Sequence, residues 1–337
     1  MKLKAAIFYD PFCPKLRPDA YSVTYLDQLL ALHDCFEVTR YNVASCSAKD
    51  IEADVIIIYD IHSSHHIQIE GLKNHPAVKY SYLNDPHQQE FKGQYRNGPP
   101  VHKLGAEQRT RRELERGTDF IICPYQDGYF QHLAPHLGPE AEKMLFWFPP
   151  APSITRFPDR ARPLKERRHR ILGNGILHGG NGAYDFRKWA YSQRPETFYV
   201  KHAMERPDVP QGMEYGKLLC SFAASLALCD WYVVPKYQEI PLAGCVCFAQ
   251  HQMDYAEMGF KHGENCIFVT KENYKRRAME FLSSEGTIND TYFQKIATAG
   301  RELIESKWTA ERFAEALYRH AQNQIQSCQA QGVSTHE

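Results

Sequence analysis

Short apolar segments alternate with amphipathic segments along the first half of the chain. Residues 20–33 place Tyr25, Leu29 and His33 at helical spacing, which predicts a helix. The run at residues 54–59 is rich in β-branched side chains, which is typical of a central parallel strand covered on both faces. Similar apolar runs predict strands at residues 4–9, 36–41, 54–59, 78–83, 120–123 and 144–148.

A second series of the same kind follows residue 170. Its apolar runs predict strands at residues 170–173, 197–201, 231–234, 245–249 and 266–269. Its helical periodicity predicts helices at residues 214–229, 236–243, 271–283, 290–306 and 309–327. Strands that alternate with helices favour an α/β fold with two Rossmann-like, doubly wound domains facing a cleft. Ligands of such sheets bind outside the carboxyl ends of the strands.

A proline-containing, basic stretch separates the two series. Prolines 149, 150 and 152 stop regular structure, and the residues after them are polar and basic. We therefore expect an N-terminal domain at 1–155, a basic linker at 156–169, a C-terminal domain at 170–308, a last helix at 309–327 packing back toward the N-terminal domain, and a flexible tail at 328–337.

The overall charge changes this picture little. The 337 residues include 40 basic and 40 acidic side chains, which argues against a protein that coats polyanions. Two local basic stretches, 109–116 and 156–170, are candidates for contact with an anionic surface. No apolar window suits a membrane span or a signal peptide, and the ten cysteines include no C-x-x-C pair. We expect a cytoplasmic protein that contacts the membrane peripherally.

The segment from Lys236 to Gly244 carries the most informative chemistry. It places a cation and a carboxylate, Glu239, at the start of a helix that follows a buried strand. A carboxylate in this place can accept hydrogen bonds from ribose hydroxyls, and Lys236 with free helix N–H groups favours phosphate. The alternative is that Glu239 only stabilises the N-terminus of its own helix.

A glycine-rich loop opens the second series. Gly173 and Gly175 follow the strand at 170–173, and glycine lets a backbone approach a diphosphate closely. Arg187 comes after this loop and is a candidate to neutralise charge on a leaving group. His202, after the strand at 197–201, is a candidate neighbour of a nucleotide base. Each has an alternative as an ordinary loop or surface residue.

Polar side chains also follow two strands of the first series. His62 follows the strand at 54–59, and Asp85 and His87 follow the strand at 78–83. Such side chains can accept the hydroxyl proton of an acceptor. His62 and His66 have a spacing that metal sites use, but no carboxylate or cysteine completes the set, so we expect no metal.

Four short motifs resemble the C-terminal domain of GT-B glycosyltransferases, in the group related to spore-maturation glycosyltransferases. The resemblance covers the stretch from Tyr215 to Arg301 and the helices after it. The motifs are Tyr215-Gly-Lys-Leu-Leu219, Lys236-Tyr-Gln-Glu239 with Ala243-Gly244, Met258-Gly-Phe260 with Gly263-Glu-Asn265, and Ala299-Gly-Arg301-Glu with Trp308-Thr309.

The resemblance implies a transferase that moves a sugar from a nucleotide sugar, UDP-linked by expectation, to an acceptor. It places Glu239 on the donor ribose and implies neither a metal nor a bound cofactor. The other residues expected to bind the donor are Lys236, Tyr237, Arg187, Gly173, Gly175, His202 and Gly244. Related retaining enzymes carry a second glutamate eight residues before the first, where this chain has Trp231. Retention of configuration is nevertheless the expected outcome.

Two other functions remain open at this point. One is a nucleotide-sugar epimerase on the same fold, and the other is a non-catalytic protein that binds nucleotide or carbohydrate. The acceptor is open as well, among saccharides, small molecules, proteins and DNA. If the reaction inverts configuration, Asp85 or His87 is the candidate base, and His62 completes the expected acceptor side.

Overall fold

The chain forms two compact units. The computed structural model describes residues 2–11, 13, 16–18, 20, 23–59, 67–87, 89–94, 100–177, 182–200, 212–286 and 288–333. Unit 1 comprises Met1–Arg17, Gln28–Pro149 and Glu311–Glu337, and unit 2 comprises Pro18–Asp27 and Pro150–Ala310. These boundaries differ from the expected domains, because residues 18–27 and the stretch 156–169 belong to unit 2.

Unit 1 contains a six-stranded sheet in which all neighbouring strands are parallel. In spatial order its strands are β2 (Glu37–Asn42), β1 (Lys4–Tyr9), β3 (Val55–Tyr59), β4 (Val78–Tyr82), β7 (Phe120–Cys123) and β8 (Leu145–Trp147). Every residue of β3 is buried, as the β-branched run predicts. An antiparallel pair, β5 (Phe91–Gln94) and β6 (Pro100–Lys103), lies outside this sheet.

Five helices of unit 1 lie within its described residues. They are α1 (Thr24–Cys35, whose first four residues belong to unit 2), α2 (Ala106–Arg116), α3 (Gln126–Gly128), α4 (Ala141–Met144) and α11 (Ala310–Val333), with short turns at Tyr129–Leu133 and Ala134–His136. Phe313 of α11 packs on Phe146 and Phe148, and Tyr318 packs on Phe36. These ring contacts join the last helix to unit 1.

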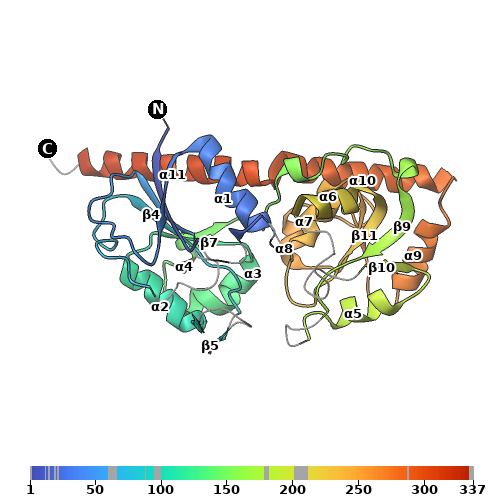
Figure 1. Ribbon diagram of the computed structural model, residues 1–337, viewed down its shortest axis with the longest axis horizontal. Helices are drawn as coiled ribbons and strands as arrows, with labels where there is room; N and C mark the ends of the chain where they lie inside the picture. The colour runs from blue at the N-terminus through green and yellow to red at the C-terminus, as the bar shows by residue number, and fades with distance from the viewer. Residues whose placement is uncertain are drawn as a thin grey trace. The chain divides into compact units, whose positions relative to one another are not determined.

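Unit 2 contains a five-stranded parallel sheet (Figure 1). In spatial order its strands are β10 (Thr197–Tyr199), β9 (Arg168–Gly173), β11 (Phe222–Ala227), β12 (Val246–Ala249) and β13 (Ile267–Phe268). The order along the chain reverses between β9 and β11. In doubly wound sheets this reversal is the point where ligands bind, because the loops after the two strands diverge there.

Six helices of unit 2 lie within its described residues. They are α5 (Asp185–Ser192), α6 (Gly212–Cys220), α7 (Lys236–Leu242), α8 (Met253–Glu257), α9 (Tyr274–Leu282) and α10 (Ile288–Lys307), with short turns at Ile154–Arg156 and Leu164–Glu166. Helix α7 packs on β11 and β12, α5 packs on β10, and α9 packs on β9. Buried side chains of β9, β11, β12, β13, α5, α9 and α10 form one apolar cluster.

One predicted helix is wrong over its second half. The periodicity at 214–229 predicts a single helix followed by a strand at 231–234, but α6 ends at Cys220 and the strand is β11. Every side chain of β11 is buried. Alanine and leucine favour helix locally, yet a segment that is apolar on both faces fits a central parallel strand, so burial outweighs local propensity here.

The basic stretch at 109–116 is neutralised within its own helix. Arg116 is buried and lies 2.9 Å from the Glu113 carboxylate, and Arg111 and Arg112 pair with glutamates about one turn away. Arg109 is buried and donates to backbone carbonyls. This stretch therefore offers little free positive charge. Within the described residues, no helix combines the length and the apolar character that a membrane crossing needs.

Candidate functional site

Several polar side chains meet at the carboxyl edge of the unit 2 sheet, where the strand order reverses. Gly173 ends β9, and Gly175 follows it with φ +141°. A Cβ atom on Gly175 would lie 3.0 Å from Cε of Lys236 and 3.5 Å from Nη1 of Arg187. The positive φ favours glycine at this position, and the missing side chain leaves room for the two cations beside the loop. We call Asn174, Gly175, Arg187, Tyr215 and Lys236 the carboxyl-edge cluster.

Arg187 is fixed by the two loops that leave the reversal point. It comes from α5 and is only 3% exposed. Its Nε donates to the Leu228 carbonyl oxygen at 2.8 Å, after β11, and its Nη1 donates to Ile176 at 3.0 Å, after β9. The guanidinium stacks 4.0 Å from the Tyr184 ring centroid. Its Nη2 is buried and has no hydrogen-bond acceptor among the described residues.

Lys236 supplies the second cation as the first residue of α7. Its ammonium donates to the Tyr215 hydroxyl, lies 4.6 Å from the centroid of that ring, and is 3.5 Å from Oδ1 of Asn174. Burial is the main cause that lowers the pKa of Lys236; Glu239 opposes the shift and Arg187 adds to it, and together they bring the pKa to about 7. Two neighbouring cations, one of which has a buried N–H group without an acceptor among the described residues, are suited to an anion.

Glu239, one turn along α7, is buried in an ion-pair network. Its Oε1 accepts hydrogen bonds from Oγ1 of Thr24 at 3.3 Å and from Nη2 of Arg156 at 3.2 Å. Arg156 also pairs with Asp27, with Nε and Oδ2 2.5 Å apart. Burial raises the pKa of Asp27, although Arg156 opposes the shift. The second oxygen of Glu239, Oε2, makes no hydrogen bond to a described residue.

Two of the predicted donor residues lie apart from the carboxyl-edge cluster. Tyr237 points into the core, where its hydroxyl donates to the Gln250 carbonyl oxygen at 3.1 Å and its ring packs on Tyr255. Gly244 follows the other end of α7, and a Cβ atom there would lie 2.1 Å from the Arg160 carbonyl oxygen. Both positions are structural. His202 lies outside the described residues.

In unit 1, Asp85 and His87 lie together in the loop that follows β4. Asp85 has φ +49°, a left-handed conformation that is uncommon for a residue other than glycine. Buried Arg109 holds this loop, since its Nη1 donates to the Asp85 carbonyl oxygen at 2.8 Å and its Nη2 donates to that of Asn84. His62, the third predicted catalytic residue, lies outside the described residues.

His87 is partly buried beside a second imidazole. Its ring lies edge-on to His132, with the centroids 6.5 Å apart. Burial lowers the pKa of His87, and Asp85 opposes that shift. A neutral imidazole next to a carboxylate can accept a proton, so the loop has the chemistry of a general base.

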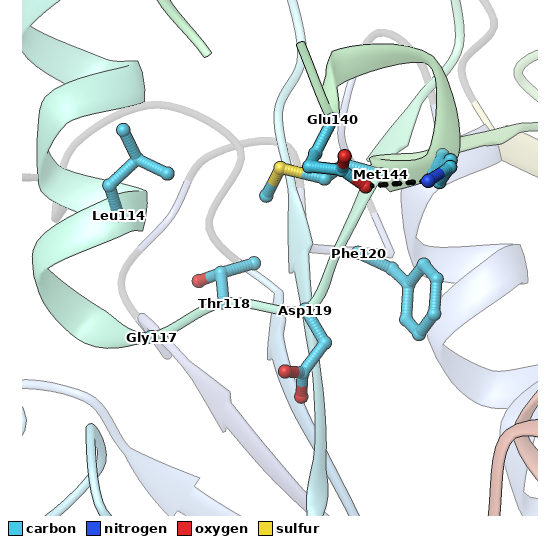
Figure 2. A pocket seen from close by; sticks show the side chains of 8 residues that line it. Leu114, Gly117, Thr118, Asp119, Phe120, Glu140 and Met144 are labelled. Carbon is cyan, nitrogen blue, oxygen red and sulfur yellow. Dashed lines mark ion pairs between the residues drawn. The ribbon is translucent and has the colours of Figure 1, made fainter. Parts of the chain in front are cut away.

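A hollow in unit 1 lies at the opposite edge of the same sheet (Figure 2). It has a volume of about 430 Å³ and includes Asp119 and Phe120, at the amino end of β7. Glu140 and Lys143, three residues apart in the chain, pair at 2.9 Å on one side of it (Figure 2). Because Asp85 and His87 follow the carboxyl end of β4, this hollow is separate from them.

Sequence reasoning missed the residues that hold the predicted ones in place. Asn174 lies between two predicted glycines, and Tyr215 begins a motif of the resemblance, so a local signal existed for both. Arg156 falls in the stretch expected to be a basic linker. Nothing local marks Thr24 or Asp27, because Thr24 contacts Glu239 and Asp27 pairs with Arg156, and both partners lie far away in the chain. Within the described ranges, no group of three His, Cys, Asp or Glu side chains could hold a metal ion.

Comparison with known proteins finds similarity in structure alone. No protein family matches the sequence, and no curated protein matches it. Anabaena HepE, solved with UDP-glucose, has a TM-score of 0.61 at 10% identity, over 96% of this chain and 100% of its own. A glycosyltransferase from Rickettsia africae ESF-5 has a TM-score of 0.59 at 11% identity, over 95% of this chain and 98% of its own.

A third similar structure is an alpha-glucosyltransferase in complex with UDP and a 13-mer DNA, with a TM-score of 0.56 at 11% identity, over 95% of this chain and 99% of its own. At such low identity these similarities establish the architecture and leave the narrower group open. With two parallel-sheet α/β units and these structural neighbours, the chain has the GT-B fold that its sequence predicts.

Proposed function

We propose that the chain is a glycosyltransferase that uses a UDP-sugar donor bound by unit 2. The observation that carries the proposal is the pair of cations at the strand-order reversal of unit 2. Arg187 and Lys236 converge on the glycine loop, and Nη2 of Arg187 has no acceptor among the described residues. A nucleotide diphosphate supplies the anionic oxygens that such a pair would bind.

The proposed ribose contact is Glu239. Its Oε1 is held by Thr24 and Arg156, so the remaining oxygen has a fixed direction and can accept a ribose hydroxyl. Arg156 acts here as a positioning residue, because it touches the carboxylate and not the ligand. HepE and the alpha-glucosyltransferase, both solved with UDP or a UDP-sugar, support the choice of donor.

The proposed chemistry is departure of the diphosphate with stabilisation of its growing charge. Arg187 is locked in place before the reaction, so it needs no reorganisation when the leaving group becomes more negative. We propose a retaining, metal-independent reaction that needs no bound cofactor. Asp85, His87 and His62 of unit 1 are the proposed acceptor-side residues, and the acceptor stays open among saccharides, small molecules, proteins and DNA.

Binding of UDP and of 2′-deoxy-UDP, measured by calorimetry, tests the ribose contact. We expect the wild type to prefer UDP by about tenfold, which is the value of one hydrogen bond to a charged group. Glu239→Ala and Arg156→Ala should remove this preference, and Glu257→Ala, an exposed glutamate of the same unit, should keep it. If UDP does not bind the wild type at all, the proposal is wrong.

Turnover separates the transferase from a non-catalytic binding protein. Trp231 stands where related enzymes have a glutamate, and it is exposed. The missing glutamate leaves open the second function, a non-catalytic protein that binds nucleotide or carbohydrate. A panel of UDP-sugars is incubated with the protein, and release of UDP is followed. Slow release of UDP by the wild type supports the transferase, provided that Arg187→Ala abolishes the release and Lys188→Ala retains it. Tight binding without release from any donor, with or without acceptors, would favour the binding protein.

A further inference from the structure

A second charged surface of unit 2 lies at the amino edge of its sheet, opposite the carboxyl-edge cluster. Arg168 and Arg170 alternate with buried residues along β9, so both point to the same exposed face. Arg194 precedes β10, and Phe198 of that strand is 46% exposed. We call Arg168, Arg170, Arg194 and Phe198 the amino-edge patch.

The patch is hollowed on both sides of an aromatic ring. One hollow, of about 290 Å³, is lined by Arg168, Arg170 and Phe198 among others, and the next, of about 480 Å³, by Arg170, Arg194 and Phe198. Arg170 and Phe198 line both, so the hollows adjoin. The Phe198 ring rests on buried Phe222, with the centroids 5.5 Å apart, which supports it from below.

The positive charge of the patch is not neutralised within the described structure. Elsewhere in the stretch 156–170, Arg156, Arg160 and Arg162 form ion pairs with carboxylates. The three arginines of the patch have no ion pair with a described residue, and Glu285 is the single acidic side chain among the described residues that line the hollows. Planar guanidinium groups bind carboxylates through two parallel hydrogen bonds.

We propose that the amino-edge patch binds an acidic oligosaccharide, with carboxylates on the arginines and one sugar ring against Phe198. A linear chain fits two adjoining hollows, whereas a bilayer surface is flat on this scale. The choice of saccharide over nucleic acid rests on the proposed function. An acidic oligosaccharide bound at the amino-edge patch would anchor a saccharide acceptor to the enzyme.

Binding of a galacturonic acid hexamer to the full chain, measured without donor, tests the proposal. Arg170→Glu should weaken binding at least about tenfold and Phe198→Ala about fivefold. Raising the salt from about 50 to about 300 mM should also weaken it. The matched controls Lys295→Glu and Tyr292→Ala change an exposed cation and a 46% exposed ring of α10, and they should bind the hexamer as the wild type does.

Three results would overturn the proposal. The first is equal binding of neutral maltohexaose, and the second is unchanged affinity in Arg170→Glu. The third is an Arg170-dependent interaction of oligo-dT or of phosphatidylglycerol vesicles in place of the hexamer. UDP binding by Arg170→Glu should equal that of the wild type, because the two sites lie at opposite edges of the sheet. Absence of UDP binding would instead contradict the proposed function.

Discussion

At the scale of single residues, the environment of each ionisable group sets its chemistry. Lys236 and Arg187 are both cations at one edge of the unit 2 sheet, yet only the lysine can lose its charge near neutral pH. Burial lowers the pKa of Lys236 to about 7, whereas a guanidinium stays charged in any protein environment. The charge of the carboxyl-edge cluster therefore depends on pH.

UDP binding should accordingly weaken as the pH rises. The diphosphate favours charged Lys236, so above pH 7 binding must take up a proton, and Kd should rise by up to about tenfold per pH unit. Calorimetry between about pH 7 and pH 9, in buffers of different ionisation enthalpy, measures both the affinity and the proton uptake. Lys236→Arg should bind with little pH dependence, and an equal slope in this variant would contradict the role of Lys236.

Without ligand, pH should act on the stability of the protein in the opposite direction, so that the contribution of Lys236 to the free energy of unfolding increases as the pH rises. The folded state releases the Lys236 proton at about pH 7, while the unfolded chain holds it to about its usual value of 10.5. Unfolding therefore takes up a proton between these values, and the contribution of Lys236 to stability rises with pH across that window.

At the scale of elements, the junction of α7 and β12 depends on a close backbone contact. Gly244 has φ +74° and leaves no room for a side chain against the Arg160 carbonyl oxygen. The contact packs the stretch 156–170 on the end of α7. Burial of Arg167, which donates to the Ala243 carbonyl oxygen at 2.8 Å, reinforces it.

Gly244→Ala should therefore lower the free energy of unfolding by about 2 kcal/mol or more, since it adds a steric clash to the cost of a positive φ. Gly286→Ala is the matched control, because Gly286 has φ +72° with open space around it and should lose about 1 kcal/mol. Urea unfolding followed by fluorescence measures both. Equal losses in the two variants would show that the contact is unimportant.

At the scale of the whole molecule, chain segments from both halves of the sequence build unit 2. Residues 18–27 belong to it, and the Arg156 ion pairs with Asp27 and Glu239 tie them to the rest. All three side chains are buried. The network thus couples the integrity of unit 2 to the proposed ribose contact.

Arg156→Ala should cost about 3–5 kcal/mol of unfolding free energy, because it leaves buried carboxylates without a counter-charge. Arg160→Ala, from the same stretch, removes a partly exposed pair with Glu305 and should cost about 1 kcal/mol or less. The comparison uses urea unfolding at neutral pH. If the two variants lose similar stability, the buried network does not hold residues 18–27.

The sequence by itself determined the α/β alternation, the two series of parallel strands, and the glycines and cations at the reversal point of unit 2. These features are local, because strand periodicity, glycine and charge are visible in neighbouring residues. The tertiary structure decided the rest. Burial on both faces made β11 a strand, and long-range contacts join Glu239 to Thr24 and Arg156, and Arg156 to Asp27. Contacts between residues distant in sequence leave no periodic signal, so only the folded chain brings them together.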